Sequence, residues 1–219
     1  MKRFWIILAV VIVGLVGLFI VTKPKDSGQD NFTGNATQLQ ADDHVRNARD
    51  LPVTLIEYGD FQCPSCGAYY PMLKKLEETY SSQVSFVFRH FPLRTIHPNA
   101  QAASLAAEAA GKQGKFFEMH DKLFETQNAW GQVATNQQSL FEGYAEELGL
   151  NMDQFKADYV SSEAAARINR DVSSGKQFNI TGTPTFILNG QKIENPADEA
   201  AFKKVLDDAI KQAGGTPPT

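Results

Sequence analysis

The pattern of hydrophobic and polar positions changes abruptly near the start of the chain. Phe4 to Val21 are 18 consecutive residues without a polar side chain. As a helix they would span about 27 Å, close to the roughly 30 Å of a bilayer's hydrocarbon. The run exceeds the apolar region of a cleaved signal peptide and lacks a small-x-small site before Lys23. Residues 1–22 are therefore predicted to be an uncleaved transmembrane anchor, with the body of the protein outside the cytoplasm.

Residues 23–48 are rich in Asp, Gln, Asn, Thr and Gly and show no apolar periodicity, which predicts a flexible tether. Regular patterns begin after it. Residues 53–58 form a nearly continuous apolar run of strand length, residues 64–80 have helical spacing, and apolar positions alternate over 84–89. Strand, helix and strand at this spacing predict a parallel β-α-β unit.

Residues from about 99 to 177 contain several helical patterns and no convincing strand. Strand signals return at 185–188 and 191–193, on either side of Asn189-Gly190, a strong hairpin turn signal. An amphipathic helix over 197–212 closes the domain. The sequence thus predicts an α/β domain over residues 49–213, with a helical insertion between β-α-β and β-β-α halves and a tail at 214–219.

Charge narrows the function classes. Four bases and no acid lie in the first 25 residues, which leaves 17 bases and 25 acids in the remainder. A body with net charge −8 lacks the basic surface of a nucleic-acid-binding protein. Both cysteines lie in one tetrapeptide, Cys63-Pro64-Ser65-Cys66, which excludes a disulfide-stapled scaffold and a zinc site built from two cysteine pairs.

The tetrapeptide is suited to thiol chemistry. Pro64 favours the first position of a helix, which makes Cys63 the N-cap, facing free amides and the positive end of the helix dipole. A thiolate is stabilised there, and such cysteines have pKa values of roughly 3.5–7.5. Cys66 follows on the same face, within disulfide reach, and is expected to be more buried with a higher pKa. Cys63 would be the attacking sulfur and Cys66 the resolving one.

Over residues 42–213 the chain resembles the DsbA-like thiol:disulfide oxidoreductases of the thioredoxin superfamily. The segments that carry the resemblance are Glu57-Tyr-Gly-Asp-Phe-Gln-Cys-Pro-Ser-Cys66, Arg89-His-Phe-Pro-Leu93, His97-Pro-Asn-Ala100, Gln113-Gly-Lys-Phe-Phe-Glu-Met-His120 and Thr181-Gly-Thr-Pro-Thr-Phe186. It implies a thioredoxin-like fold, a redox-active disulfide and no further cofactor or metal.

The resemblance also implies roles for other residues. Glu57 matches the buried acid beneath the dithiol, which could take the Cys66 proton. Thr183-Pro184 matches a loop with a cis proline, whose backbone would pair with an extended substrate. Ser65 stands where the enterobacterial oxidases have a histidine, so it brings no positive charge to tune Cys63.

The leading hypothesis is an oxidase that introduces disulfides into reduced or unfolded exported polypeptides and is reoxidised by a membrane redox partner. A reductase or isomerase of the same fold is the alternative within redox chemistry. A metal-binding module using both thiols and one histidine (His44, His90, His97 or His120) is the alternative from another class. The histidines His90 and His97 are expected to be structural.

Overall fold

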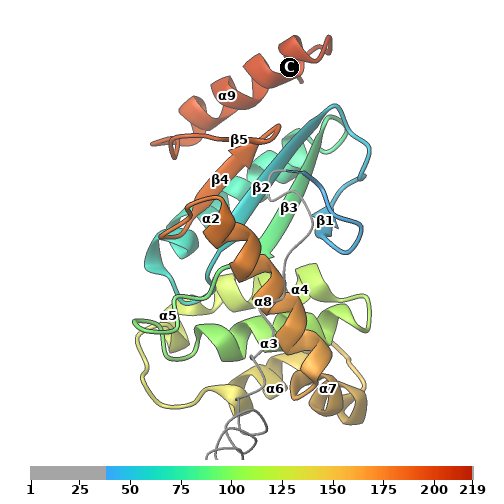
Figure 1. Ribbon diagram of the computed structural model, residues 1–219. Helices are drawn as coiled ribbons and strands as arrows, with labels where there is room; N and C mark the ends of the chain where they lie inside the picture. The colour runs from blue at the N-terminus through green and yellow to red at the C-terminus, as the bar shows by residue number, and fades with distance from the viewer. Residues whose placement is uncertain (1–37, 219) are drawn as a thin grey trace, which may run out of the picture. The chain divides into compact units, whose positions relative to one another are not determined.

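The computed structural model describes residues 38–218 (Figure 1). The predicted anchor, and the predicted tether up to residue 37, lie outside the described residues. Within 38–218, no helix combines the length and the apolar character needed to cross a membrane.

A mixed five-stranded sheet forms the centre of the fold, in the order β1-β3-β2-β4-β5. Strands β2 and β3 are parallel, as the β-α-β pattern predicts, and the other neighbouring pairs are antiparallel. The strands are β1 (His44–Arg46), β2 (Val53–Gly59), β3 (Val84–His90), β4 (Thr185–Leu188) and β5 (Gln191–Lys192). Asn189 and Gly190, between β4 and β5, have φ values of 47° and 84°, the positive values that a type I′ hairpin turn requires.

Helices cover both faces of the sheet. Alternate side chains of the strands, such as Leu55 and Phe86, pack against α2 (Pro64–Thr79) and α9 (Glu199–Gln212) in one buried cluster. Side chains of the opposite face, such as Ile56 and Val87, pack against Val172 of α8 (Ser162–Gln177) in another. The sheet is therefore apolar on both faces, which explains the continuous apolar runs in β2 and β3.

Most helices of the insertion lie beyond one end of the sheet, away from α9, and only the last of them, α8, also runs along a face of the sheet (Figure 1). They are α3 (Ala100–Gly111), α4 (Phe116–Glu125), α5 (Gln127–Trp130), α6 (Gln138–Glu147), α7 (Met152–Tyr159) and α8 (Ser162–Gln177). Their core joins residues of all these elements except α8 with Cys63 and Cys66. The dithiol thus lies at the junction between the sheet and the insertion.

The predicted tether is wrong at its end. Residues 44–46, assigned to it from their composition, form strand β1, paired antiparallel with β3. A strand of three half-buried residues is too short to show an alternation of apolar and polar positions in the sequence. Side-chain contacts with residues distant in the chain hold it in place. Arg46 forms ion pairs with Glu77 (2.7 Å) and Asp121 (2.6 Å).

Candidate active site

The dithiol lies at the first turn of α2. Cys63 is the N-cap with extended backbone angles (φ −68°, ψ 122°), and Pro64 follows at the start of the helix. The Cys63 carbonyl accepts from the Gly67 amide at 3.1 Å, which closes the first turn. Proline at this position costs no hydrogen bond and has the helical φ, so the local sequence alone places the cysteines here.

The side chains of Asp60 and Gln62 hold the loop that leads into the dithiol. The buried Asp60 carboxylate accepts from the Gln62 amide (2.7 Å), the Leu93 amide (2.8 Å) and His97 Nδ1 (2.7 Å). Gln62 accepts from the Asn99 amide at 2.6 Å, at the start of the insertion. His97 is thus engaged in fixing this loop, as expected for a structural histidine.

The Cys63 side chain makes a contact that its N-cap position did not predict. Its sulfur makes no capping hydrogen bond; the thiol donates to the Thr183 carbonyl at 3.4 Å. The pKa of Cys63 is nevertheless lowered to about 5, first by a hydrogen bond from the Cys66 thiol. The Thr183 hydroxyl and the Ser65 and Cys66 amides also lower it, against the opposing effect of burial.

Cys66 has the opposite environment. It is 1% exposed, against 6% for Cys63, and both are free thiols in this structure. Burial raises the pKa of Cys66 well above its ordinary value. One sulfur is therefore ionised near neutral pH and the other carries a proton, which is the order that the sequence predicts and the division of labour that an attacking and a resolving thiol require.

The Thr183–Pro184 loop faces the dithiol, and its peptide bond is cis. Next to it is an open hollow of about 620 Å³ lined by residues 181–185 and 192–195. The Thr183 hydroxyl has no hydrogen-bond partner among the described residues. Pro64 and Ser65 of the dithiol tetrapeptide are exposed. Thr183 lines this hollow and also contacts Cys63, so the hollow adjoins the dithiol.

Beneath the dithiol, strand β2 carries Glu57 into the interior. Its Oε1 is buried without a hydrogen-bond partner, and the pKa of its carboxyl is raised to about 8, first by burial and then by the charges of Glu77 and Cys63. Glu57 shares a small cavity of about 10 Å³ with Glu77 of α2 and His120 of α4. That is space for about one water molecule.

Sequence reasoning missed Glu77. The sequence contains a pattern that could have identified it. Helical spacing places Glu77 on the inward face of α2, together with Cys66, Tyr70 and Leu73. An acid on that face is unusual, yet its position relative to Glu57 depends on how α2 packs on the sheet.

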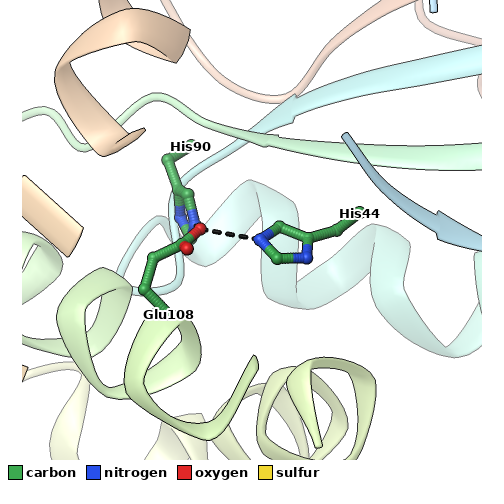
Figure 2. Close-up of side chains that lie close together, drawn as sticks. All are labelled: His44, His90 and Glu108. Atoms are coloured by element: carbon green, nitrogen blue, oxygen red, sulfur yellow. Dashed lines mark hydrogen bonds and ion pairs between the residues drawn. The ribbon is translucent and has the colours of Figure 1, made fainter. Parts of the chain in front are cut away.

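Another polar group offers ligands that a metal ion could use. His44, His90 and Glu108 come from β1, β3 and α3, and their ligand atoms lie within 4.8 Å of one another (Figure 2). Both imidazole Nε2 atoms lie 2.8 Å from the same Glu108 oxygen, so the three side chains also bind one another without an ion. The buried His90 Nδ1 has no hydrogen-bond partner among the described residues. In residues 38–218 this is the one group of at least three such ligands, and it contains neither cysteine.

Two kinds of comparison agree on the fold. A family profile described as thioredoxin matches residues 40–208. The crystal structure of Wolbachia pipientis α-DsbA1 is similar with a TM-score of 0.72 and 21% identity, over 82% of this chain and 98% of that chain. The oxidised BdbD of Bacillus subtilis is similar with a TM-score of 0.65 and 26% identity, over 76% of this chain and 92% of that one. The thioredoxin-like α/β fold expected from the sequence is therefore confirmed.

Among curated proteins, similarity extends to part of much longer chains. A protein named Na⁺/H⁺ antiporter NhaA 3 of Salinispora tropica is 40% identical over 171 residues, which are 78% of this chain and 25% of that protein. NhaA of Herminiimonas arsenicoxydans is 33% identical over 165 residues, again 25% of its length. This chain thus spans about a quarter of the length of these relatives.

Proposed function

The chain belongs to the thioredoxin family, and we propose that it is a DsbA-like oxidase that introduces disulfides into exported polypeptides. Homologues with this fold are protein-disulfide oxidoreductases, which confirms the enzyme class expected from the sequence. The observation that carries the proposal is the asymmetric dithiol, with the pKa of Cys63 at about 5 and that of Cys66 far above it. A stabilised Cys63 thiolate favours the reduced enzyme, so the disulfide form is a good oxidant.

The reaction follows from that asymmetry. A substrate thiolate attacks the Cys63 sulfur of the Cys63–Cys66 disulfide, and Cys66 leaves with the electron pair and takes up a proton. A second substrate thiolate then attacks the substrate sulfur of the mixed disulfide, forms the substrate disulfide and releases Cys63 as a thiolate. The Thr183–Pro184 loop would hold the substrate in an extended conformation beside Cys63, through backbone hydrogen bonds.

Reoxidation completes the cycle. The Cys63 thiolate attacks a disulfide of a membrane redox partner, and Cys66 then attacks Cys63 and releases the partner's reduced sulfur. We place the enzyme at the cell membrane with its catalytic domain on the extracytoplasmic side, because an oxidising compartment is where such disulfides persist. The apolar run of residues 4–21 and the basic residues at its amino end support that placement.

Two measurements test the oxidase. With Cys66→Ala, Cys63 of the full-length protein is first converted to its mixed disulfide with thionitrobenzoate. A thiolate of a reduced exported protein should then attack the Cys63 sulfur, displace thionitrobenzoate and accumulate as a covalent complex, which dithiothreitol releases and Cys63→Ala abolishes. The reduction potential of the Cys63–Cys66 pair in a glutathione series should lie between about −180 and −120 mV, as in oxidases and isomerases. A potential near −270 mV, as in thioredoxin, would identify a reductase instead.

A further inference from the structure

Glu57 is nearly buried, and its side chain borders a small cavity. Its Oε1 is buried and unpaired, and the residue as a whole is 8% exposed. A group that receives the Cys66 proton in each cycle must pass it on before the next cycle. The small cavity that Glu57 shares with Glu77 offers a path for that proton.

Glu77 lies between that cavity and the surface. Its side chain is 12% exposed, and its Oε2 lies 2.7 Å from Arg46 Nε, whose side chain is 24% exposed. One carboxyl therefore borders both the cavity and the solvent-accessible edge of the molecule. Within residues 38–218, the carboxylates and bases that line the cavity are Glu57, Glu77 and His120.

We propose that Glu77 is the outer member of a proton relay, in which one water molecule in this cavity carries protons between the Glu57 and Glu77 carboxyls. The inference rests on the proposed oxidoreductase function. Glu77 touches no reacting atom and acts through Glu57, so it is a positioning residue rather than a catalytic one.

Protons leave the site when Cys66 attacks a mixed disulfide. The Cys66 thiol gives its proton to Glu57, the bond between Cys66 and Cys63 forms, and the partner's sulfur leaves with the electron pair. Glu57 passes the proton through the water to Glu77, which releases it to solvent. When a substrate thiolate opens the Cys63–Cys66 disulfide, the same path delivers a proton to the departing Cys66 thiolate.

The charges around the two acids fit this task. Burial raises the pKa of Glu77 to about 7, and the pKa of Glu57 is about 8, so the two carboxyls differ little in proton affinity. A relay needs such a match, because a large difference would trap the proton on one member. Around Glu77 stand Arg46 of β1, Lys74 and Glu78 of α2, and Asp121 of α4; around Glu57 stand the two cysteines.

His120 also lines the cavity but does not replace Glu77. Burial lowers its pKa, so the ring is neutral at pH 7, and its Nδ1 lies 2.9 Å from Asp121. Glu77 is thus the group on the outer side whose protonation changes near neutral pH.

The test separates the two thiol steps in one experiment. Reduced full-length protein is mixed with 5,5′-dithiobis(2-nitrobenzoate) in a stopped-flow instrument at pH 5–10. Attack by Cys63 releases the first thionitrobenzoate, and attack by Cys66 on the mixed disulfide releases the second. Glu77→Gln should slow the second release at its pH plateau about tenfold and leave the first within about twofold. Glu78→Gln, an exposed neighbour on the same helix, is the matched control and should change neither.

The relay also predicts non-additivity. Glu57→Gln should slow the second release about a hundredfold, and adding Glu77→Gln to it should cause no further loss, because the outer member is useless without the inner one. Glu77→Asp keeps a carboxyl and should recover part of the rate. The relay is overturned if Glu77→Gln only moves the midpoint of the pH profile downward and keeps the plateau, since that is the effect of removing a neighbouring charge.

A measurement on the unchanged protein covers the case in which Glu77→Gln does not fold. The rate of the second release is followed in mixtures of H₂O and D₂O. A curved dependence on the deuterium fraction, which indicates several protons in flight, supports the relay, and a linear one overturns it. If the protein shows no second release and traps no substrate, the oxidoreductase function itself fails, which is a different outcome.

Discussion

Two regions of the interior hold charge in opposite ways. In the first, which we call the paired cluster, Arg89 lies between Asp43 (2.7 Å) and the Tyr58 hydroxyl (2.8 Å), and both ionic side chains are 1% exposed. In the second, which we call the acid pair, Glu57 and Glu77 share a cavity and have Arg46 as their one ion-pair partner among the described residues. The paired cluster joins Asp43, which directly precedes β1, to strands β2 and β3 of the sheet. The acid pair lies beneath the dithiol.

The partners of a buried charge distinguish a structural role from a functional one. A buried ion pair with matched partners stays charged and is costly to break. A buried acid without a partner keeps its proton near neutral pH, destabilises the fold when it ionises, and is therefore available for proton transfer. Burial alone does not separate the two regions; the partners do.

The largest expected effect comes from breaking the paired cluster. Asp43→Ala leaves Arg89 buried beside Tyr58 without its carboxylate and should reduce the free energy of unfolding by about 3–5 kcal/mol. Urea unfolding at pH 7 measures it. Asp42→Ala is the control, because its side chain is 53% exposed and its pair with Arg170 is expected to contribute less than about 1 kcal/mol. Equal losses for the two variants would show that the cluster is not a distinct structural unit.

Replacing Glu57, the inner member of the acid pair, should instead increase the free energy of unfolding. The folded pKa of Glu57, about 8, lies above the ordinary value of 4.5, so the associated stability is present below about pH 4.5 and lost as the pH rises through 8. Glu57→Gln avoids that loss and should be more stable than the unchanged protein by about 3 kcal/mol at pH 7. Unfolding midpoints at pH 5, 7 and 9 should show the difference shrinking on acidification. A variant that is less stable at every pH would contradict the picture of an unpaired acid.

The oxidation state of the dithiol gives a smaller effect. The pKa of Cys63 falls from an ordinary 9 to about 5, so its stabilisation of the reduced protein is present above about pH 9 and lost as the pH falls through 5. At pH 7 the thiolate contributes about 3 kcal/mol, and loop closure by the disulfide offsets about 2 kcal/mol of it. The free energy of unfolding of the reduced protein should therefore exceed that of the oxidised protein by about 1 kcal/mol at pH 7, and reduced protein should unfold at a higher urea concentration. The difference should disappear toward pH 4. Greater stability of the oxidised form at pH 7 would favour a reductase.

The smallest effect concerns the hydroxyl that faces the dithiol from the opposite loop. The Thr183 hydroxyl has no partner while Cys63 is a thiol, and it lowers the pKa of Cys63 by donating to the thiolate. Thr183→Val should raise that pKa by about half a unit, equivalent to about 0.7 kcal/mol. Titration of the thiolate absorbance at 240 nm measures it, with the exposed Thr181→Val as the control. Identical titration curves for both variants would remove Thr183 from the set of groups that tune Cys63.

Local patterns in the sequence determined most of the fold. The strands at 53–59 and 84–90, the helix that begins at Pro64, and the hairpin at Asn189-Gly190 depend on periodicity and on backbone preferences of neighbouring residues. The place of the dithiol follows from the same signals, because proline favours the first position of a helix. These features were predictable since each is encoded within a few consecutive residues.

Tertiary structure alone decided which polar groups meet. Strand β1 is held by side-chain contacts of Arg46 and His44 with acids of α2, α3 and α4. The pattern of residues 44–46 does not predict a strand. Glu57 and Glu77 are 20 positions apart on a strand and a helix, and the cavity between them exists only once α2 packs on the sheet. Whether a carboxyl is charged, neutral or paired depends on burial and on partners distant in the chain. Long-range packing sets both the burial and the partners. The sequence therefore shows which acids are present, and the tertiary structure determines whether each is protonated.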